Sequence, residues 1–240
     1  MNVIYEDQTP RQRRHDENLR RILDTAMRLV EEGGLAALSI NRLAEEVDYT
    51  PGALYRYFGS KDALLSQLIE RVLSEVRGHL VRAQALLPAR ATPLARVLVL
   101  VEGYRVFAKR EPHRFGLLAT SLAEPRILLR EDAVARPVMA LMMSPMQPLA
   151  EALTAAERAG LLAAGDPSER TLCVFAFLQG LLPLRKRTRS APGVFDVDRL
   201  AVRGTRALLL GWGARPRAVD AAIEQVARLG ELTVRLGGDA

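Results

Sequence analysis

The chain of 240 residues has few of the residue types that build disulfides and metal clusters. Its single cysteine, Cys173, excludes an internal disulfide and any cluster of cysteine ligands, and its place in an apolar run is typical of an unreactive thiol. The three histidines, His15, His79 and His113, fall on separate predicted elements without the spacing of a metal site. No phosphate-binding loop, nucleophile motif or pair of carboxylates is found either. We therefore expect no metal, no cofactor and no enzymatic activity.

Long hydrophobic runs are missing as well, although 49% of the residues are apolar. The longest near-apolar run, residues 172–184, contains Gln179 and is too short to span a bilayer. The N-terminus does not show the positive, apolar and small segments of a secretory signal. These observations predict a cytoplasmic protein with a buried core and no membrane partner.

Lysine is scarce, and the positive charge is unevenly placed. The net charge is +6, and Lys61, Lys109 and Lys186 are the only lysines among 34 basic residues. Residues 10–77 hold 11 basic and 11 acidic residues, whereas residues 78–240 hold 23 basic and 15 acidic ones. Bulk charge is therefore poor evidence for a nucleic-acid partner, and the local placement of basic side chains must decide.

Apolar residues recur at helical spacing along nearly the whole chain, and no alternating pattern typical of strands persists. A loop is expected at residues 188–195, and residues 1–12 are expected to form a disordered arm. The predicted fold class is all-α. Helix starts are indicated by capping residues and prolines at Ser39, Thr50, Ser60, Thr92, Glu111, Asp166, Asp196 or Asp198, and Pro216.

The stretch TPGALYRYFGSK, residues 50–61, gathers three aromatic side chains, an arginine and a lysine. It follows a short helix that begins near Ser39 and a turn at Asp48 and Tyr49. This order is the plan of a helix-turn-helix, in which the second helix enters the DNA major groove by its N-terminus. The small residues Thr50, Gly52 and Ala53 would let the backbone approach the base edges closely, and two of them offer methyl groups to thymine.

The two faces of this second helix carry different residue types. Leu54 and Phe58 lie four residues apart and are expected in the core. Tyr55, Arg56 and Tyr57 then remain exposed. Lys61 begins the next helix, where its charge opposes the helix dipole and would be better placed against a phosphate. The sequence therefore predicts that Tyr55, Arg56, Tyr57 and Lys61 face DNA.

Several short motifs occur together within residues 20–70. They are the helix end at Ala26, Gly33 and Gly34, the pair Leu43 and Ala44, the pattern Gly52-x-Leu54-Tyr55-x-x-Phe58, and the helix start with Ser60, Lys61, Leu64 and Leu65. With this combination, the segment resembles the N-terminal domain of the TetR family of bacterial transcription regulators. One departure is Asp48, where the family commonly has glycine, but aspartate tolerates left-handed backbone better than most residues. Tyr49, where a smaller apolar residue is usual, should plug the turn.

The resemblance implies a helix-turn-helix domain over residues 13–75 and a helical bundle for ligand binding and dimerisation over residues 76–240. It also implies a homodimer, in which each subunit binds one half-site of a palindromic double-stranded DNA operator. The two recognition helices would then enter successive major grooves on one face of the DNA. Arg11, Arg13 and Arg14 either add phosphate or minor-groove contacts or belong to a solvated arm. The DNA contacts implied by the family pattern are Ser39, Asn41, Arg42, Thr50, Gly52, Ala53, Tyr55, Arg56, Tyr57 and Lys61.

Two further regions are expected from the same resemblance. The helices that begin near Asp166 and Asp196 are similar to the family's dimerisation pair, with Phe175, Leu178, Gly180, Leu182, Leu200, Gly204, Leu208 and Trp212 at the interface. The central helices of the family enclose a pocket for a small effector, which is expected here to be apolar or amphipathic and to release the DNA. The pocket residues predicted are Tyr104, Phe107, His113, Phe115, Leu118, Met139, Met142, Met143, Phe175 and Gln179.

A different class of protein remains open on sequence alone. A helical small-molecule-binding protein or an enzyme without DNA activity would share the apolar helices of the C-terminal part. The exposed aromatic and basic residues after Thr50 argue against it. Repression is the more common activity in the family, but the sequence does not distinguish repression from activation.

Overall fold

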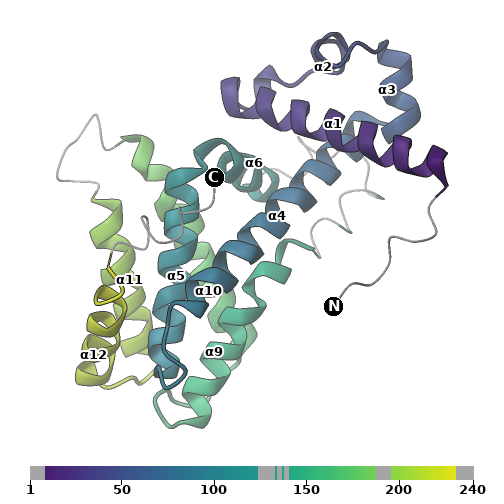
Figure 1. Cartoon of the computed structure of the whole chain (residues 1–240). Coiled ribbons are helices and arrows are strands. Elements are labelled where there is room, and N and C mark those ends of the chain that lie inside the picture. The colour runs from purple at the N-terminus through teal and green to yellow at the C-terminus, as the bar shows by residue number, and fades with distance from the viewer. Residues whose placement is uncertain (1–8, 124–132, 134–136, 138–140, 188–195, 231–240) are drawn as a thin grey trace. The chain divides into compact units, whose positions relative to one another are not determined.

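The structure is a computed structural model, and it describes residues 9–123, 133, 137, 141–187 and 196–230 (Figure 1). Every regular element in these ranges is a helix, which confirms the predicted all-α class. None of the described helices is long and apolar enough to cross a membrane. The expected loop at 188–195 lies outside the described residues.

The chain divides into two compact units. The first contains Met1–Val72 and His113–Met139, and the second contains Leu73–Pro112 and Ala140–Ala240. The sequence predicted a boundary near residue 75 but did not predict that a later segment joins the first unit. The side chain of Arg114 accounts for part of this return, because its Nε donates to Glu31 Oε1 at 2.7 Å.

In the residues that the structure describes, the first unit contains five helical segments and the beginning of a long sixth helix. They are α1 (Pro10–Gly33), the 3-10 turn η1 (Leu35–Ala37), α2 (Ile40–Glu46), α3 (Pro51–Phe58), α6 (Pro112–Ala123) and the first half of α4 (Lys61–Ala85). Its core is a cluster of fully buried aliphatic side chains, among them Ile22, Leu29, Leu43, Leu54 and Leu64. Burying this apolar surface stabilises the short segments η1, α2 and α3, which would be only marginally stable as isolated helices.

The N-terminal helix begins earlier than the sequence predicted. Thr9 and Gln12 form a reciprocal capping box, and Pro10 occupies the first helical position, where its missing N–H costs nothing. Residues 10–12 therefore belong to α1 and not to a disordered arm. The exposed Arg11, Arg13 and Arg14 lie on the first turns of this helix.

The second unit is a bundle of longer helices (Figure 1). It contains the second half of α4, α5 (Pro93–Arg110), η2 (Ser144–Met146), α9 (Gln147–Arg158), α10 (Pro167–Leu181), η3 (Leu182–Arg187), α11 (Val197–Gly211) and α12 (Pro216–Ala227). Helix α5 is central: it packs against α9, α11 and α12, while α10 packs against α9 and α11. The predicted caps Thr92, Asp166 and Asp196 each accept a hydrogen bond from a backbone N–H of the first helical turn.

Candidate functional site

Helices α2 and α3 are joined by a tight turn whose geometry depends on Asp48. Its φ of 57° lies in the left-handed region, and it is the one non-glycine residue with positive φ among those the structure describes. Ser39 Oγ caps α2 through the Arg42 N–H, and Thr50 Oγ1 caps α3 through the Ala53 N–H. The predicted survival of the turn with aspartate in place of glycine is confirmed.

Helix α3 separates a buried face from an exposed one. Leu54 and Phe58 are 0% and 7% exposed and anchor the helix, as the sequence predicted. Tyr55 is 47% exposed, and Arg56 and Lys61 are also exposed. Neither of these two cations forms a salt bridge within the described part of the chain. Their charges are thus available to an anionic partner.

Tyr57 differs from its prediction as an exposed residue. Its ring stacks on His15 of α1, with centroids 4.9 Å apart, and on Tyr49 of the turn, with centroids 6.0 Å apart. Burial, followed by a hydrogen bond with Tyr49, raises the pKa of the Tyr57 hydroxyl. The reason is that α1 extends to Pro10 and therefore reaches over this side of α3. Tyr57 thus packs α3 against α1 and the turn, and only part of its side chain remains exposed.

Tyr49 is half-buried at the turn, where it was predicted to pack, and its ring contacts Arg21 and Tyr57. The guanidinium of Arg21 lies 5.5 Å from the centroid of its ring, a distance typical of a cation–π contact. Arg21 also donates to the carbonyl of Val47 at 3.3 Å. This cluster of His15, Tyr57, Tyr49 and Arg21 joins α1 to the helix-turn-helix, and we call it the stacking cluster.

Most of the other residues predicted to contact DNA are exposed. Asn41, Arg42 and Gly52 are exposed, and Ala53 is half-buried. Arg42 lies 3.6 Å from a carboxylate oxygen of Glu32, an exposed pair that contributes little and can be exchanged for a phosphate. All of the predicted DNA contacts lie on α2, the residues that cap α2 and α3, α3 itself and the first residue of α4.

The predicted effector-pocket residues are divided between the two units. His113, Phe115 and Leu118 belong to the first unit, and His113 is exposed. Met143 of the second unit is 38% exposed, and Met139 lies outside the described residues. Tyr104, Phe107, Met142 and Phe175 are buried in the second unit, as expected of a pocket or of a core.

A cluster within the second unit joins three helices through aromatic contacts. The rings of His79 on α4 and Phe107 on α5 lie 6.0 Å apart, edge to face. The rings of Tyr104 on α5 and Phe175 on α10 lie 6.4 Å apart. Gln179 follows Phe175 by one helical turn and shares its face. We call these five residues the inner cluster.

The polar groups of the inner cluster are unusual. His79 Nε2 and both polar atoms of the Gln179 amide are buried without a hydrogen-bond partner among the described residues. Burial, and then the charges of Arg82 and Arg110, lower the pKa of His79 to about 4, so its imidazole is neutral at pH 7. Burial also raises the pKa of Tyr104. His79 is not among the residues predicted for the pocket, although it continues the apolar stripe of Val72 and Val76, and this position indicates a buried side chain.

The predicted dimer face needs correction on α10. Phe175, Leu178 and Leu182 are 7%, 2% and 3% exposed, so they are core residues of the single chain. Beyond its first turn, α10 leaves Leu172, Cys173, Ala176 and Gly180 exposed, which recur at helical spacing. On α11, Leu200, Gly204, Leu208 and Trp212 are half-buried. Gly204 faces Phe177, whose ring occupies the space that a Cβ would need.

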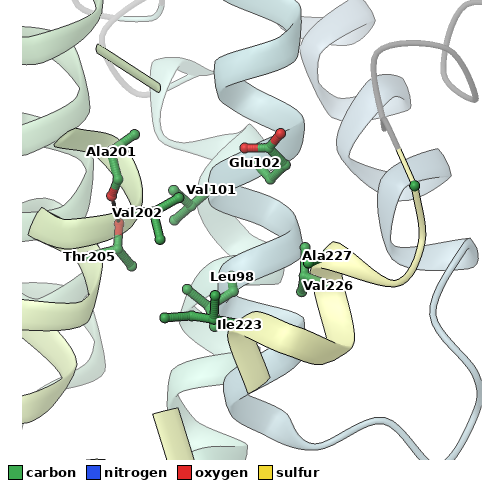
Figure 2. A pocket seen from close by; sticks show the side chains of 10 residues that line it. Leu98, Val101, Glu102, Ala201, Val202, Thr205, Ile223, Val226 and Ala227 are labelled. Carbon is green, nitrogen blue, oxygen red and sulfur yellow. Dashed lines mark hydrogen bonds between the residues drawn. The ribbon is translucent and has the colours of Figure 1, made fainter. Parts of the chain in front are cut away.

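A separate hollow of about 200 Å³ lies between α5, α11 and α12 (Figure 2). Its walls are mostly apolar and include Leu98, Val101, Val202 and Ile223. Glu102 lies at its edge, but both carboxylate oxygens accept hydrogen bonds from the buried Arg105. None of the residues predicted for the effector pocket lines this hollow.

The tight turn followed by an exposed, N-terminally capped second helix defines a helix-turn-helix protein. Residues 22–68 match the model of bacterial regulatory proteins of the tetR family. The helix-turn-helix part of the chain thus matches that of this family.

Two curated relatives are similar to this chain over its N-terminal part. The HTH-type transcriptional repressor KstR of Mycobacterium tuberculosis is 33% identical over 96 residues, which is 40% of this chain and 42% of the relative. The HTH-type transcriptional regulator BetI of Rhizobium meliloti is 32% identical over 80 residues, 33% of this chain and 38% of the relative. The chain thus spans less than half the length of these relatives.

Solved structures extend the likeness of fold over most of the chain. A protein from Rhodococcus with unknown function is 22% identical, with a TM-score of 0.67 over 89% of this chain and 100% of the other. RolR, in complex with its ligand resorcinol, is 19% identical, with a TM-score of 0.60 over 90% of this chain and 96% of the other. At these identities the likeness concerns the fold.

Proposed function

We propose that the protein is a transcriptional regulator that binds a palindromic DNA operator as a homodimer and is released from it by a small effector. The observation that carries this proposal is the exposed end of the helix-turn-helix. Helix α3 begins at Pro51, is capped by Thr50 and presents Tyr55 and Arg56 to solvent, and the exposed Lys61 follows three residues after its end. A helical protein that does not bind DNA would gain nothing from exposing one aromatic and two basic side chains at this place.

The N-terminus of α3 is the part that would enter the major groove. Gly52 has no heavy atom within 4 Å of the place where a Cβ would lie, so this surface is open to a base edge. Tyr55 Oη, Arg56 and Lys61 would hold phosphates, which position the protein without reading sequence. Base recognition would then depend on Thr50, Gly52 and Ala53, with Arg56 reading guanine if it reaches the groove.

Dimerisation would use the exposed apolar stripe of α10. Leu172 is 54% exposed, and Cys173, Ala176 and Gly180 continue its face. A second copy that covers this stripe would remove apolar surface from water and would allow close helix approach at the two small residues. Two helix-turn-helix units, each serving one half-site, are what a palindromic operator requires.

Regulation would depend on helix α4, whose 25 residues run without interruption from the first unit into the second. At 1.5 Å per residue it is nearly 40 Å long. Its start carries Lys61 and the core residue Leu64, and its later part carries His79 of the inner cluster. An effector bound at the inner cluster would thus act on the same helix that holds the DNA contact. Repression is favoured because KstR, by its name, is a repressor.

The test is binding of the purified protein to the DNA upstream of its own gene. Fluorescence anisotropy over a range of salt concentrations should show specific binding that weakens steeply as salt rises, and a shuffled fragment of equal length should bind much more weakly. Arg56→Ala should weaken specific binding while the far-ultraviolet circular dichroism is unchanged. Equal affinity for both fragments would favour the alternative of a helical small-molecule-binding protein or enzyme.

A further inference from the structure

We propose that the inner cluster binds a neutral effector whose polar group both donates and accepts hydrogen bonds, such as an amide or hydroxyl on an apolar body. His79 and Gln179 would bind the polar group, and Phe107, Tyr104 and Phe175 would pack against the body. This inference rests on the effector part of the proposed function and names the chemistry of that effector.

Buried polar atoms of the inner cluster that lack hydrogen-bond partners among the described residues indicate a ligand site. A buried polar group that lacks a partner costs about 1–3 kcal/mol, so proteins pair nearly all of them. Here three such atoms, His79 Nε2 and Gln179 Nε2 and Oε1, are buried with no partner in the described part of the chain. His79 on α4 contacts Phe107 of α5, and Phe175, one helical turn before Gln179 on α10, contacts Tyr104 of α5. Such a group is expected where a ligand completes the bonding.

The kinds of unpaired atom define the ligand's polar group. A primary amide side chain offers N–H donors and a carbonyl acceptor, and both ends of Gln179 are open. A neutral imidazole offers one donor and one acceptor. A ligand group that only accepts would leave the Gln179 oxygen unsatisfied, and a group that only donates would leave its nitrogen unsatisfied. An amide or a hydroxyl group meets both needs.

The charge of the ligand follows from its surroundings. Arg82 and Arg110 are exposed, so solvent screens their attraction for an anion. The imidazole of His79 is neutral at pH 7 and cannot compensate a buried carboxylate. Burying an unpaired carboxylate costs far more than burying an amide that is hydrogen-bonded. A neutral ligand is therefore favoured over its anionic counterpart.

The hollow of Figure 2 fits this role less well. Its one carboxylate, Glu102, is held by Arg105, and the hydroxyl of the buried Thr205 donates to the Ala201 carbonyl at 2.8 Å. Among the described residues it offers apolar walls but no buried side-chain polar atom that lacks a partner. The inner cluster is thus the site at which a ligand would gain both packing and hydrogen bonds.

The first experiment needs no ligand. Gln179→Met keeps the length of the side chain and removes two unpaired atoms, so it should raise the midpoint of thermal unfolding of the free protein by about 2–4 °C. His79→Leu should act in the same direction. Thr205→Val is the matched control, because it removes a buried hydroxyl that is already bonded, and its midpoint should not rise. A lower midpoint for both Gln179→Met and His79→Leu would show that the protein itself satisfies these groups, and would overturn the proposal.

The second experiment uses two probes with the same body, 4-tert-butylbenzamide and 4-tert-butylbenzoate. The amide should stabilise the wild-type protein against heat and the benzoate should not, and Gln179→Met should weaken binding of the amide at least about fivefold in calorimetry. The proposal is wrong if the benzoate stabilises as strongly as the amide, if the amide gives no shift up to its solubility limit, or if Gln179→Met binds it unchanged.

Neither experiment contains DNA, so the outcome is independent of operator binding. Amide binding that depends on Gln179, together with failure to bind the upstream fragment, would retain the ligand site and refute the regulatory function. Specific operator binding without any response to the amide would do the reverse.

Discussion

The ring of His15 stacks on the ring of Tyr57 at a centroid distance of 4.9 Å and an interplanar angle of 12°. The contact ties the start of α1 to the helix proposed to read DNA. His15→Ala should therefore loosen α3 and lower operator affinity by about two- to fivefold, the equivalent of about 0.5–1 kcal/mol. Anisotropy titrations with the upstream fragment would measure the change.

Tyr57→Phe is the matched control for this contact. It keeps the stacked ring and removes only the hydroxyl that bonds with Tyr49 and Asn18. If stacking is what positions α3, Tyr57→Phe should bind DNA more tightly than Tyr57→Ala does. Equal losses in the two variants would assign the effect to the hydroxyl.

Lys61→Ala should weaken binding to all DNA sequences alike. Removal of one phosphate contact should reduce the slope of log affinity against log salt by about one. Lys109→Ala is the matched control, because Lys109 is also exposed but lies on α5 of the second unit. An unchanged slope for Lys61→Ala would show that this lysine does not contact the backbone of DNA.

Stability should fall in mild acid because of His79. The folded protein lowers the pKa of His79 to about 4, chiefly by burial and then through Arg82 and Arg110, whereas the ordinary value is 6.5. Between these values the unfolded chain binds a proton that the folded chain does not, so the free energy of unfolding decreases as the pH drops. The full loss is about 3 kcal/mol, since one unit is worth about 1.4 kcal/mol.

Urea unfolding at pH 7.5 and pH 4.5 would measure this loss. His79→Leu should reduce the difference between the two pH values, because the residue that takes up the proton is gone. His113→Gln, a change at an exposed histidine of α6, should leave the difference as in the wild type. If His79→Leu keeps the wild-type difference, other groups cause the acid sensitivity.

Leu172→Asp should convert the proposed dimer to a monomer. A charge in the middle of the covered stripe would lack a partner and would cost several kcal/mol of association free energy. Light scattering at micromolar concentration would detect the change in mass. Val81→Asp, at another exposed apolar residue, is the control and should remain dimeric. A monomeric wild type would contradict the dimer itself.

Local features of the fold could be predicted from the sequence, because their causes are neighbours in the chain. The caps at Ser39 and Thr50 depend on residues three positions away, and the left-handed turn at Asp48 depends on the tolerance of aspartate for that geometry. The packing of Tyr57 could not be predicted in this way. It depends on His15, which lies 42 positions earlier in α1 and meets Tyr57 only in the folded chain.

The errors on α10 have a different physical origin. Helix α10 has apolar residues on all sides, so the periodicity of its sequence does not show which side packs against its own chain and which side faces a partner. Only the positions of α9 and α11 show that Leu178 is internal and Leu172 external. Likewise, the sequence shows Gln179 in an apolar run, but only the structure shows that its amide has no partner in the described residues.

Gly204 sets the distance between α10 and α11. A Cβ at this position would lie 2.1 Å from the nearest ring atom of Phe177, so even alanine would force the ring to move or the helices apart. The close spacing of the two helices therefore depends on the absence of a Cβ at position 204. If these helices form the dimer interface, the absence of a side chain at Gly204 contributes to the separation of the two helix-turn-helix units, and this position would tolerate less change than many of the residues proposed to contact DNA.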